Sequence, residues 1–262
     1  MRKMAKDIGV SASSMRRVVK QKLQLRSYHA KTAPLLTEEM RQIRLKRCKK
    51  LLKRSAEGSH RNIVFSDEKI FTVELVVNSQ NNRVLAKDIE QALSRGKIVG
   101  KTAHPTSVMV WGGTTSDGKT PLVFVDIGVK INKDIYLKSI LDDVLKPWST
   151  SHFGSRQWCF QQDSAPAHKA NVVQERCRRE LPDFIASGDW PSNSPDLNPL
   201  DFSVWSVVES KACSIRHQNL EELKAALTKA WQEMDSDYLR MTCDAFMKRL
   251  RRCVRAKGGH FE

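Results

Sequence analysis

The chain has 262 residues, which is enough for one sizeable catalytic domain and a small additional unit. Its 45 Lys and Arg outnumber its 29 Asp and Glu, and the net charge of +16 favours a polyanionic partner such as nucleic acid. No apolar stretch approaches the length of a membrane span and the N-terminus has no signal-peptide pattern, so the sequence predicts a soluble protein without a secretion signal.

The positive charge is concentrated at the two ends of the chain. Residues 1–61 hold 18 Lys and Arg against 4 Asp and Glu, and residues 240–262 hold 7 against 2, which leaves a slightly acidic middle. This distribution favours DNA contacts at the ends and a metal site between them, although a merely soluble basic surface would give the same totals. The six cysteines are scattered without a CxxC pair, so they predict neither a disulfide framework nor a zinc site, and they favour a reduced intracellular compartment.

Residues 3–22 predict two short helices around a turn at Gly9, with Ser11 as the N-cap of the second helix. Apolar residues are expected to hold the pair together: Met4, Ile8, Val10, Met15, Val18 and Val19. The other face of the second helix is expected to contact DNA through Ser13, Ser14, Arg16, Arg17 and Lys20. This is the pattern of a helix-turn-helix, although an ordinary amphipathic helix pair has the same spacing. A supporting helix before Lys3 is missing, so residues 1–26 are expected to form a partial unit.

Residues 27–61 predict a basic linker with one helix. Thr37 is its expected N-cap, acidic residues follow at once, and basic residues crowd toward its C-terminus, as the helix dipole prefers. The helix is expected to lie along DNA phosphates through Arg44, Lys46 and Arg47. The alternative is a solvated helix face without a ligand.

Residues 62–262 predict an α/β domain. Strands are expected at 62–75, 83–87 and 158–162, and two further strands are joined by a hairpin turn at Asp117-Gly118. One more strand is expected at 183–186, and helices are expected at 132–148, 169–181 and over most of 219–256. Antiparallel strands followed by alternating helices and strands predict a mixed sheet with helices packed on it.

Three aspartates stand in positions that suit a metal site. Asp67 interrupts an apolar strand, Asp163 follows the buried run 158–162, and Asp201 falls in the first turn of a helix that Asn198 would cap. Three carboxylates in one pocket would repel one another until hard divalent cations neutralised them. Each aspartate also has an ordinary explanation: a local counter-ion such as Lys69, a helix cap, or a favourable place in a helix dipole.

Four segments around these aspartates resemble mariner-like transposases: FSDEKIF, VMVWGG, QQDSAPAH and WPSNSPDLNPLDFSVW. The linker and the ending KGGHFE are similar to the family as well. The resemblance implies an RNase H-like fold and places the catalytic, metal-binding carboxylates at Asp67, Asp163 and Asp201. It favours Asp201 over the nearby Asp196, because the family's position follows the Asn-Pro pair. The 37 residues between Asp163 and Asp201, with Asp rather than Glu last, resemble one mariner subgroup.

The resemblance also implies an activity and its partners. It implies cut-and-paste transposition: cleavage of double-stranded DNA at inverted-repeat ends and strand transfer at TA targets, with two Mg²⁺ or Mn²⁺ ions. It further implies a homodimer, a nuclear location and no membrane. Because family members carry two helix-turn-helix units, this chain is expected to be truncated at its N-terminus. The alternative is a non-catalytic, domesticated DNA-binding remnant of a transposase. His168 is expected either near the site or in a helix contact or exposed.

Overall fold

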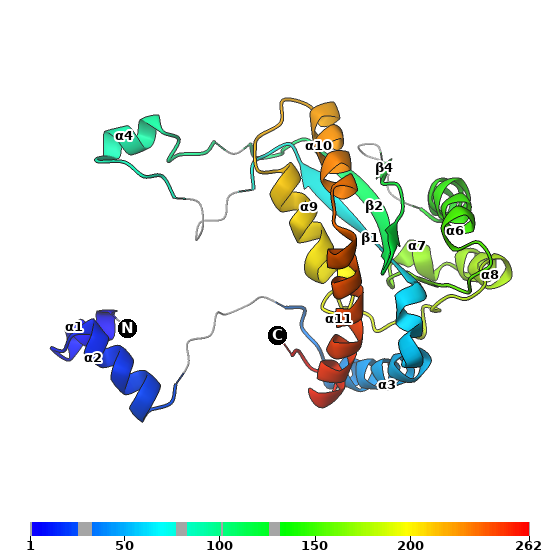
Figure 1. Ribbon diagram of the computed structural model, residues 1–262, viewed down its shortest axis with the longest axis horizontal. Helices are drawn as coiled ribbons and strands as arrows, with labels where there is room; N and C mark the ends of the chain where they lie inside the picture. The colour runs from blue at the N-terminus through cyan, green and yellow to red at the C-terminus, as the bar shows by residue number, and fades with distance from the viewer. Residues whose placement is uncertain (1, 26–32, 77–82, 101, 126–131, 262) are drawn as a thin grey trace. The chain divides into compact units, whose positions relative to one another are not determined.

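The chain forms two units, Met1–Leu35 and Leu36–Glu262, in a computed structural model that describes residues 2–25, 33–76, 83–100, 102–125 and 132–261 (Figure 1). These units differ from the predicted boundaries at residues 26 and 61. The reason is that the basic helix of the predicted linker packs on the last helix of the second unit. No helix among the described residues is both long and apolar enough to cross a membrane.

The first unit is a pair of short helices, as predicted. It contains α1 (Arg2–Asp7), α2 (Ala12–Arg17) and the π-helical extension η1 (Val18–Lys22). Gly9 makes the turn with a positive φ of 68°, and the Ser11 hydroxyl accepts a hydrogen bond of 3.0 Å from the backbone N–H of Ser14.

The core of this helix pair is smaller than predicted. It consists of Ala5, Met15 and Val19, with Ala12 packed against it. Four residues expected to be buried are exposed instead: Met4, Ile8, Val10 and Val18. The prediction was wrong for them because Ala5 is the residue of α1 that packs against α2. The methyl group of Ala5 forms only a small contact, and the four longer apolar side chains lie outside it in solvent.

The second unit is built on a mixed five-stranded sheet. Its strands are β1 (Ile63–Thr72), β2 (Ser107–Thr115), β3 (Gly118–Lys119), β4 (Val123–Val125) and β5 (Cys159–Gln161). The order is β3-β2-β1-β5, with β4 also on β2. β1 is antiparallel to β2 and parallel to β5. The pairing of β3 with β2 confirms the predicted hairpin, but its turn is Ser116-Asp117 and not Asp117-Gly118, because Gly118 already pairs with Thr115.

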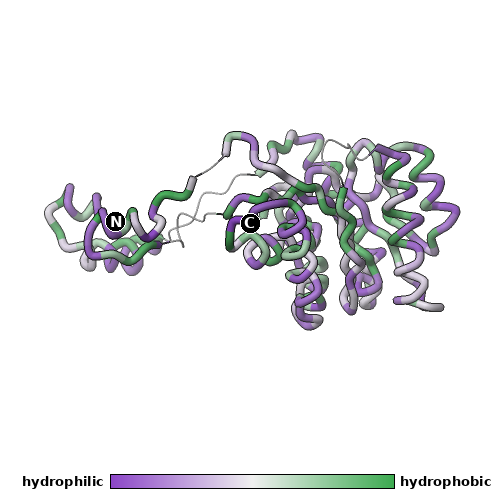
Figure 2. Tube along the Cα trace, turned by 90° about the horizontal axis from the view of Figure 1, so that it is seen from above, coloured by the Kyte–Doolittle hydropathy of each residue, from purple (hydrophilic) through white to green (hydrophobic). Residues whose placement is uncertain are grey.

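Helices cover both faces of this sheet (Figure 1). Those of the second unit are α3 (Glu38–Arg54), η2 (Ala56–Asn62), α4 (Ile89–Ser94), α5 (Lys133–Ile135), η3 (Tyr136–Leu145), α6 (Lys146–Phe153), α7 (Pro166–Lys169), α8 (Asn171–Glu180), η4 (Leu200–Val204), α9 (Trp205–Ala212), α10 (Leu220–Gln232) and α11 (Ser236–Arg255). Hydrophilic and hydrophobic residues alternate along their turns, as amphipathic helices require (Figure 2).

The alternation of β1 divides the core into two layers. Phe65 packs in the layer that contains α9, α10 and α11, whereas its neighbour Val64 packs in the layer that contains η3, α6 and α8. Successive side chains of a strand point to opposite faces, so this register also decides which face receives each of the next residues.

Two predicted strands are absent. Residues 83–87 form no strand, because the chain leaves the sheet after β1 and forms α4 before it returns in β2. The segment 183–186 contributes only one bridge, between Phe184 and Phe160. Three bonds take up the side chain of Arg54: to the Asp183 carboxylate, to the Phe184 carbonyl and to the Cys159 sulfur. The expected strand is therefore reduced to an edge contact.

The C-terminal tail closes over the junction of α3 and α11. The thiols of Cys48 and Cys253 lie 3.3 Å apart at this junction. Gly258 has φ 81°, and a Cβ atom there would lie 2.1 Å from the backbone carbonyl oxygen of Arg41. The Phe261 ring lies 5.9 Å from the Arg44 guanidinium. Residues 257–261 therefore pack as part of the second unit.

Asp244 of α11 joins η2 to the domain, and its contribution to stability should depend on pH. Arg61 donates two hydrogen bonds to its carboxylate, at 2.9 and 2.8 Å, and His60 lies 2.9 Å away. The hydrogen bond from Arg61 is the main cause that lowers the pKa of Asp244 to about 2. A carboxyl group with a lowered pKa stabilises the fold above its unfolded pKa of about 4, and this contribution is lost as the pH falls through about 2.

We therefore expect Asp244→Asn to cost about 1 kcal/mol at pH 7, after allowance for solvent screening, and less at pH 3. Urea unfolding of wild type and variant at both pH values measures the difference. Asp143→Asn, which removes a more exposed partner of Lys138, is the matched control and should change stability less. An equal cost at both pH values would contradict the assignment.

Candidate active site

Asp67 lies on the face of β1 that turns toward the C-terminal helices. It pairs with Gly112 in β2, and the indole N–H of Trp205 donates a hydrogen bond of 2.7 Å to its Oδ2 atom. Trp205 is almost fully buried, so it holds the Asp67 carboxylate in one orientation. Because the strand alternates, the next residue, Glu68, points to the opposite face.

Asp163 stands two residues beyond the end of β5, which runs parallel to β1. Its Oδ1 atom accepts a hydrogen bond of 2.8 Å from the Ala165 N–H and lies 2.6 Å from Nδ1 of His168. The other ring nitrogen of His168 lies 3.3 Å from Oε1 of Glu68. The buried imidazole therefore bridges a carboxylate at the end of β5 and another on β1.

Asp201 lies in the first turn of η4, where the predicted helix begins. Asn198, just before this helix, is buried and ties it to the sheet. Its amide donates a hydrogen bond of 3.0 Å to the Ser66 carbonyl, and its oxygen accepts one of 3.2 Å from the Leu200 N–H. The loop is thus fixed to β1 beside Asp67, which brings the third carboxylate next to the first.

The three carboxyl groups lie close enough to perturb one another. Burial, then the charges of Asp201 and Glu68, raise the pKa of Asp67 well above its usual range. Burial and the charge of Asp163 raise the pKa of Asp201 to about 6, against a hydrogen bond with Asp67. The structure therefore gathers all three predicted aspartates into one electrostatically coupled cluster, in which full ionisation is unfavourable without a cation.

His168 compensates part of this negative charge. Burial alone would lower the pKa of its imidazole, but the hydrogen bonds to Asp163 and Glu68 raise that pKa to about 10. In return, and against the effect of its own burial, the hydrogen bond from His168 lowers the pKa of Asp163. Asp163 is therefore the carboxylate of the trio that is ionised most easily.

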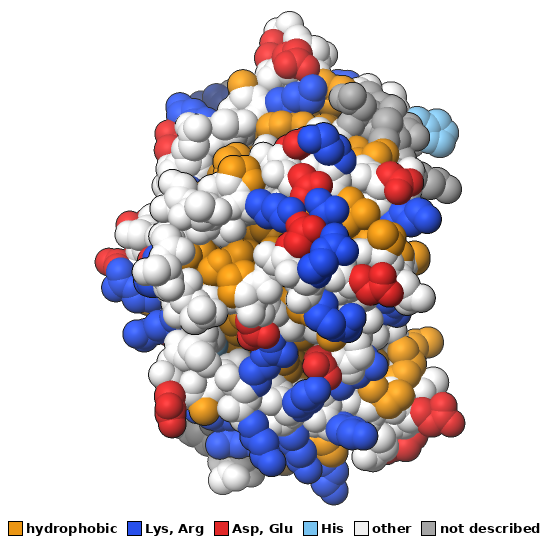
Figure 3. Space-filling view, turned by 90° about the vertical axis from the view of Figure 1, so that its right-hand side faces the viewer, with side chains coloured by type: hydrophobic (Ala, Val, Ile, Leu, Met, Phe, Trp, Pro, Cys, Tyr) orange, Lys and Arg blue, Asp and Glu red, His pale blue; other side chains and the backbone are white. Residues whose placement is uncertain are grey.

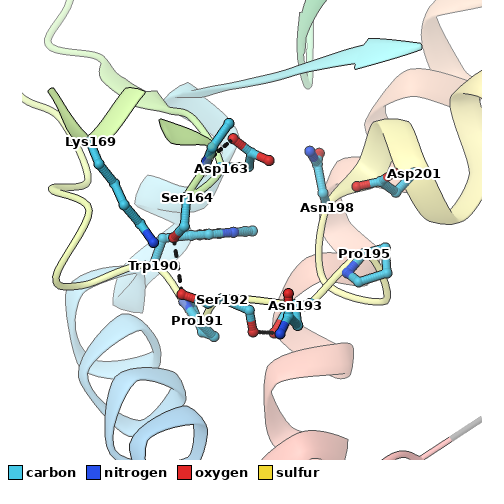
Figure 4. A pocket seen from close by; sticks show the side chains of 12 residues that line it. Asp163, Ser164, Lys169, Trp190, Pro191, Ser192, Asn193, Pro195, Asn198 and Asp201 are labelled. Atoms are coloured by element: carbon cyan, nitrogen blue, oxygen red, sulfur yellow. Dashed lines mark hydrogen bonds between the residues drawn. The ribbon is translucent and has the colours of Figure 1, made fainter. Parts of the chain in front are cut away.

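A pocket of about 480 Å³ opens beside this cluster and is lined by Asp163 and Asp201. Figure 4 shows the two aspartates near Asn198, whereas Lys169 extends along another wall toward Ser164 and Trp190. No acid of the described residues lies within 4 Å of the Lys169 ammonium group, and its charge helps to lower the pKa of Asp163. The pocket thus combines carboxylates with one cation and several hydroxyl and amide groups.

Among the described residues, one group has ligand atoms that all lie within 4.8 Å of one another: Glu68, Asp163 and His168. His168 would have to lose a proton before it could bind a metal ion. The three predicted aspartates do not form a group as close as this, but they share Asp163 with it. The uncompensated carboxylates, all oxygen donors of the type that Mg²⁺ and Mn²⁺ prefer, fit such ions.

Sequence reasoning missed Glu68 and Trp205. Glu68 follows Asp67 directly, so the alternation of the strand predicts that it points away from Asp67 and from the site. Only the position of His168 on that opposite face brings Glu68 to the site. Trp205 stands four residues after Asp201, which is one helical turn, so the helical period could have indicated that both face the same site. His168 was expected at the site, in a helix contact or exposed, and it is buried at the site.

Asp196, the competitor of Asp201, has a structural role. It forms an ion pair of 2.5 Å with Arg44, whose side chain is 2 % exposed and also donates to Cys253. The prediction that Arg44 contacts DNA is therefore corrected: this guanidinium is enclosed between α3, α11 and the loop before η4. Burial of an arginine requires such a partner, which the sequence pattern of a basic helix does not reveal.

The other predicted DNA contacts occupy two places. Lys46 of α3 is exposed, whereas Arg47 is half-buried and donates a hydrogen bond of 2.9 Å to the Trp190 carbonyl in the wall of the pocket. In the first unit the five predicted residues are all exposed: Ser13, Ser14, Arg16, Arg17 and Lys20. Their contact with DNA stays a prediction.

Comparison with known proteins gives relatives of one kind. No family model matches the sequence. The Tcb2 transposase of Caenorhabditis briggsae is 33 % identical over 152 residues, 58 % of this chain and 53 % of that protein. The Tc1 transposase of Caenorhabditis elegans is 26 % identical over 247 residues, 93 % of this chain and 86 % of that protein. The chain spans about half the length of the first of these relatives.

Solved structures of Mos1 mariner transposase have the same fold. A paired-end complex with the left transposon end aligns with a TM-score of 0.78 at 17 % identity, over 100 % of this chain and 75 % of that one. The Mos1 catalytic domain aligns with a TM-score of 0.69 at 18 % identity, over 88 % of this chain and all of that one. The second unit therefore has the predicted RNase H-like fold. In sequence, the chain is therefore similar to transposases of transposable elements, and in fold it is similar to Mos1 transposase.

Proposed function

We propose that the protein is a DNA transposase that cleaves DNA strands and transfers them to a target in a reaction that depends on a divalent metal ion. The observation that carries this proposal is the convergence of Asp67, Asp163 and Asp201 from β1, the end of β5 and η4. A remnant that only bound DNA would gain nothing from a cluster in which burial and mutual repulsion raise two carboxyl pKa values.

Each residue of the site has a role in this reaction. The aspartate oxygens would hold Mg²⁺ or Mn²⁺, with two ions as the expected number. Bound there, such ions would supply Lewis-acid stabilisation of the oxygens that carry charge in an in-line displacement. Trp205 orients Asp67, and His168 keeps Asp163 ionised and fixed. Arg47 holds the pocket loop at Trp190. The substrate strand would enter the pocket between the carboxylates and Lys169.

The assembly follows from the same proposal. Cleavage at two inverted-repeat ends and transfer to a TA target would require two copies of the chain, with the first unit reading the ends and the enzyme acting in the nucleus. The Mos1 structures similar to this chain include a paired-end complex and a strand transfer complex. The DNA in those complexes is bound by Mos1, and its binding by this chain is part of the proposal.

The direct test uses the full chain with supercoiled plasmid and with a duplex that ends in a free 3′-hydroxyl. We expect nicking of the plasmid and joining of the duplex in Mg²⁺ or Mn²⁺, and neither in EDTA. Circular dichroism and a DNA mobility shift, measured in Ca²⁺, show that the protein is folded and binds DNA. A folded chain that binds DNA but neither nicks nor joins it in either metal would overturn the proposal.

Lys169→Ala should weaken substrate binding with little change in the rate at saturating DNA. The ammonium group is placed to neutralise one phosphate, so its loss should reduce the slope of log K against log salt by about 0.7 to 0.9. Fluorescence anisotropy in Ca²⁺ measures the slope, and nicking at saturating DNA measures the rate. Lys229→Ala, which removes an exposed lysine outside the pocket, should leave both unchanged. Equal slopes for the two variants would contradict this role.

A further inference from the structure

The outward face of α11 carries a row of four cations, here called the basic ridge: Lys248, Arg251, Arg252 and Arg255. They stand at i, i+3, i+4 and i+7, so they lie on one side of the helix, and all four are exposed. The opposite side of the same turns, with Met247, Leu250 and Cys253, is buried in the core of the second unit. The basic ridge is therefore held on a rigid helix.

The basic ridge has no acidic partner. Among the described residues, no carboxylate lies within 4 Å of any of its four cations. Elsewhere in the second unit, basic groups share acids: Lys146 contacts both Asp142 and Glu180, and Arg176 contacts the same two. Figure 3 shows such mixed clusters, and it also shows Lys and Arg gathering with few acids at the end of the unit where α3 lies.

Helix stability does not account for this arrangement. Like charges three and four residues apart each destabilise a helix by about 0.2 to 0.5 kcal/mol, and the basic ridge contains four such pairs. The helix dipole favours cations only in the last turn, which holds Arg252 and Arg255. Lys248 and Arg251 lie before that turn and receive no such benefit. A ligand that supplies negative charge would remove the repulsion.

The surface beside the basic ridge is hollow. A groove of about 620 Å³ runs between α11, the end of α3 and η2, and Lys248 and Arg251 form part of one wall. Leu52 and Gly58 form part of the facing wall. Two acids, Glu57 and Asp244, line this groove. Asp244 is already bound by Arg61 and His60, so its charge is compensated without the ridge, and the exposed Glu57 forms no ion pair within 4 Å with a ridge cation.

We propose that the basic ridge binds backbone phosphates of double-stranded DNA at a surface separate from the catalytic pocket. The inference deepens the proposed function, because it takes DNA as the partner. No residue that lines the pocket belongs to α11, so the two surfaces are distinct. The seven-residue span of the ridge is about 10 Å along the helix, the axial length of about three phosphates of one strand. The contact reads charge and not sequence, so it would hold DNA on either side of the cleaved bond.

The test compares two variants that remove the same amount of charge. The ridge variant carries Lys248→Gln, Arg251→Gln, Arg252→Gln and Arg255→Gln. The control variant carries Lys138→Gln, Lys224→Gln, Lys229→Gln and Arg240→Gln, four cations that have acidic partners elsewhere in the unit. A random 30-base-pair duplex in Ca²⁺ serves as the probe, and anisotropy is measured over a range of salt concentrations.

We expect the ridge variant to bind about 10- to 100-fold more weakly at about 0.15 M salt, with the salt slope reduced by about three. The control variant should bind almost as wild type. The melting temperature of the ridge variant should equal or exceed that of wild type, because the like-charge repulsion is gone, whereas a structural role would lower it. Equal losses in both variants, or an unchanged slope in the ridge variant, would overturn the proposal.

Two further measurements distinguish DNA binding by the basic ridge from binding of an acidic polypeptide and from a role of the ridge in cleavage. Binding of polyglutamate tests an acidic polypeptide as the ligand, and a ridge-dependent loss with polyglutamate but none with DNA would also overturn the proposal. Plasmid nicking at saturating DNA should be retained by the ridge variant. If wild type itself does not nick, the proposed function fails, while the binding comparison still decides whether the ridge holds DNA.

Discussion

Replacing Asp67 with asparagine should reduce metal-dependent DNA cleavage by at least about 1000-fold, which corresponds to about 4 kcal/mol of transition-state stabilisation. The amide keeps the size of the side chain and an oxygen that can accept the hydrogen bond of Trp205, but it loses the charge that a divalent cation requires. Nicking of supercoiled plasmid in Mg²⁺ and Mn²⁺ measures the effect. A variant that nicks as fast as wild type would remove Asp67 from the site.

The same substitution should stabilise the protein when no metal is present. A carboxyl group whose pKa is raised by folding destabilises the folded state, increasingly from about pH 4 upward and fully above its raised pKa. Asp67→Asn removes this cost at neutral pH. In EDTA the melting temperature should rise by about 2 to 4 °C for each kcal/mol relieved. Loss of activity combined with a gain in stability is typical of a functional group and not of a packing residue.

Asp196→Asn is the matched control for this pair of measurements. It makes the same chemical change in the loop that leads to η4, but it removes the partner of the buried Arg44. Loss of one member of a buried ion pair costs about 3 to 5 kcal/mol, so the melting temperature should fall. The cleavage rate of the protein that stays folded should change little. Opposite signs of the two stability changes would separate the metal-site carboxylate from the structural one.

The sequence was most informative where one residue determines the local chemistry. The apolar run that Asp67 interrupts placed it on a strand, and Asn198 with Pro199 placed Asp201 at the start of a helix. Their assignment to one metal site came from the resemblance to mariner-like transposases. The two-residue period of a strand and the first turn of a helix are local properties, so they survive without knowledge of the fold. The mixed sheet followed in the same way from the order of strands and helices.

The sequence failed where the decisive contact joins distant segments. Arg44 and Asp196 are 152 residues apart, and nothing in the basic pattern of α3 shows that this arginine alone turns inward. Glu68 and His168 meet because β1 and β5 are neighbours in the sheet. Segment 183–186 has the composition of a strand, but only the observed pairing shows that it forms a single bridge. Tertiary neighbours decided each case.

Gly258→Ala should cause a large loss of stability. The glycine has φ 81°, a conformation that costs an alanine about 1 kcal/mol or more, and a Cβ atom there would lie 2.1 Å from the Arg41 carbonyl oxygen at the start of α3. The Cβ atom is fixed directly to the backbone at position 258, and its neighbour is the backbone carbonyl of Arg41. No flexible side chain can therefore move away to relieve the overlap. The tail must leave α3, which would uncover Cys253 and separate Phe261 from Arg44.

We expect this change to cost about 3 kcal/mol or more, as overpacking with backbone displacement does, and to lower the melting temperature by about 6 to 12 °C. Hydrogen exchange should become faster in the tail and in the last turn of α11, while the sheet stays protected. Gly188→Ala is the control, because no atom lies within 4 Å of its added Cβ and its φ is not positive. If both variants had the same melting temperature, close packing of the tail against α3 would not be the reason for glycine at position 258. The difference between them measures how far residues 257–261 fix α3 to the rest of the second unit.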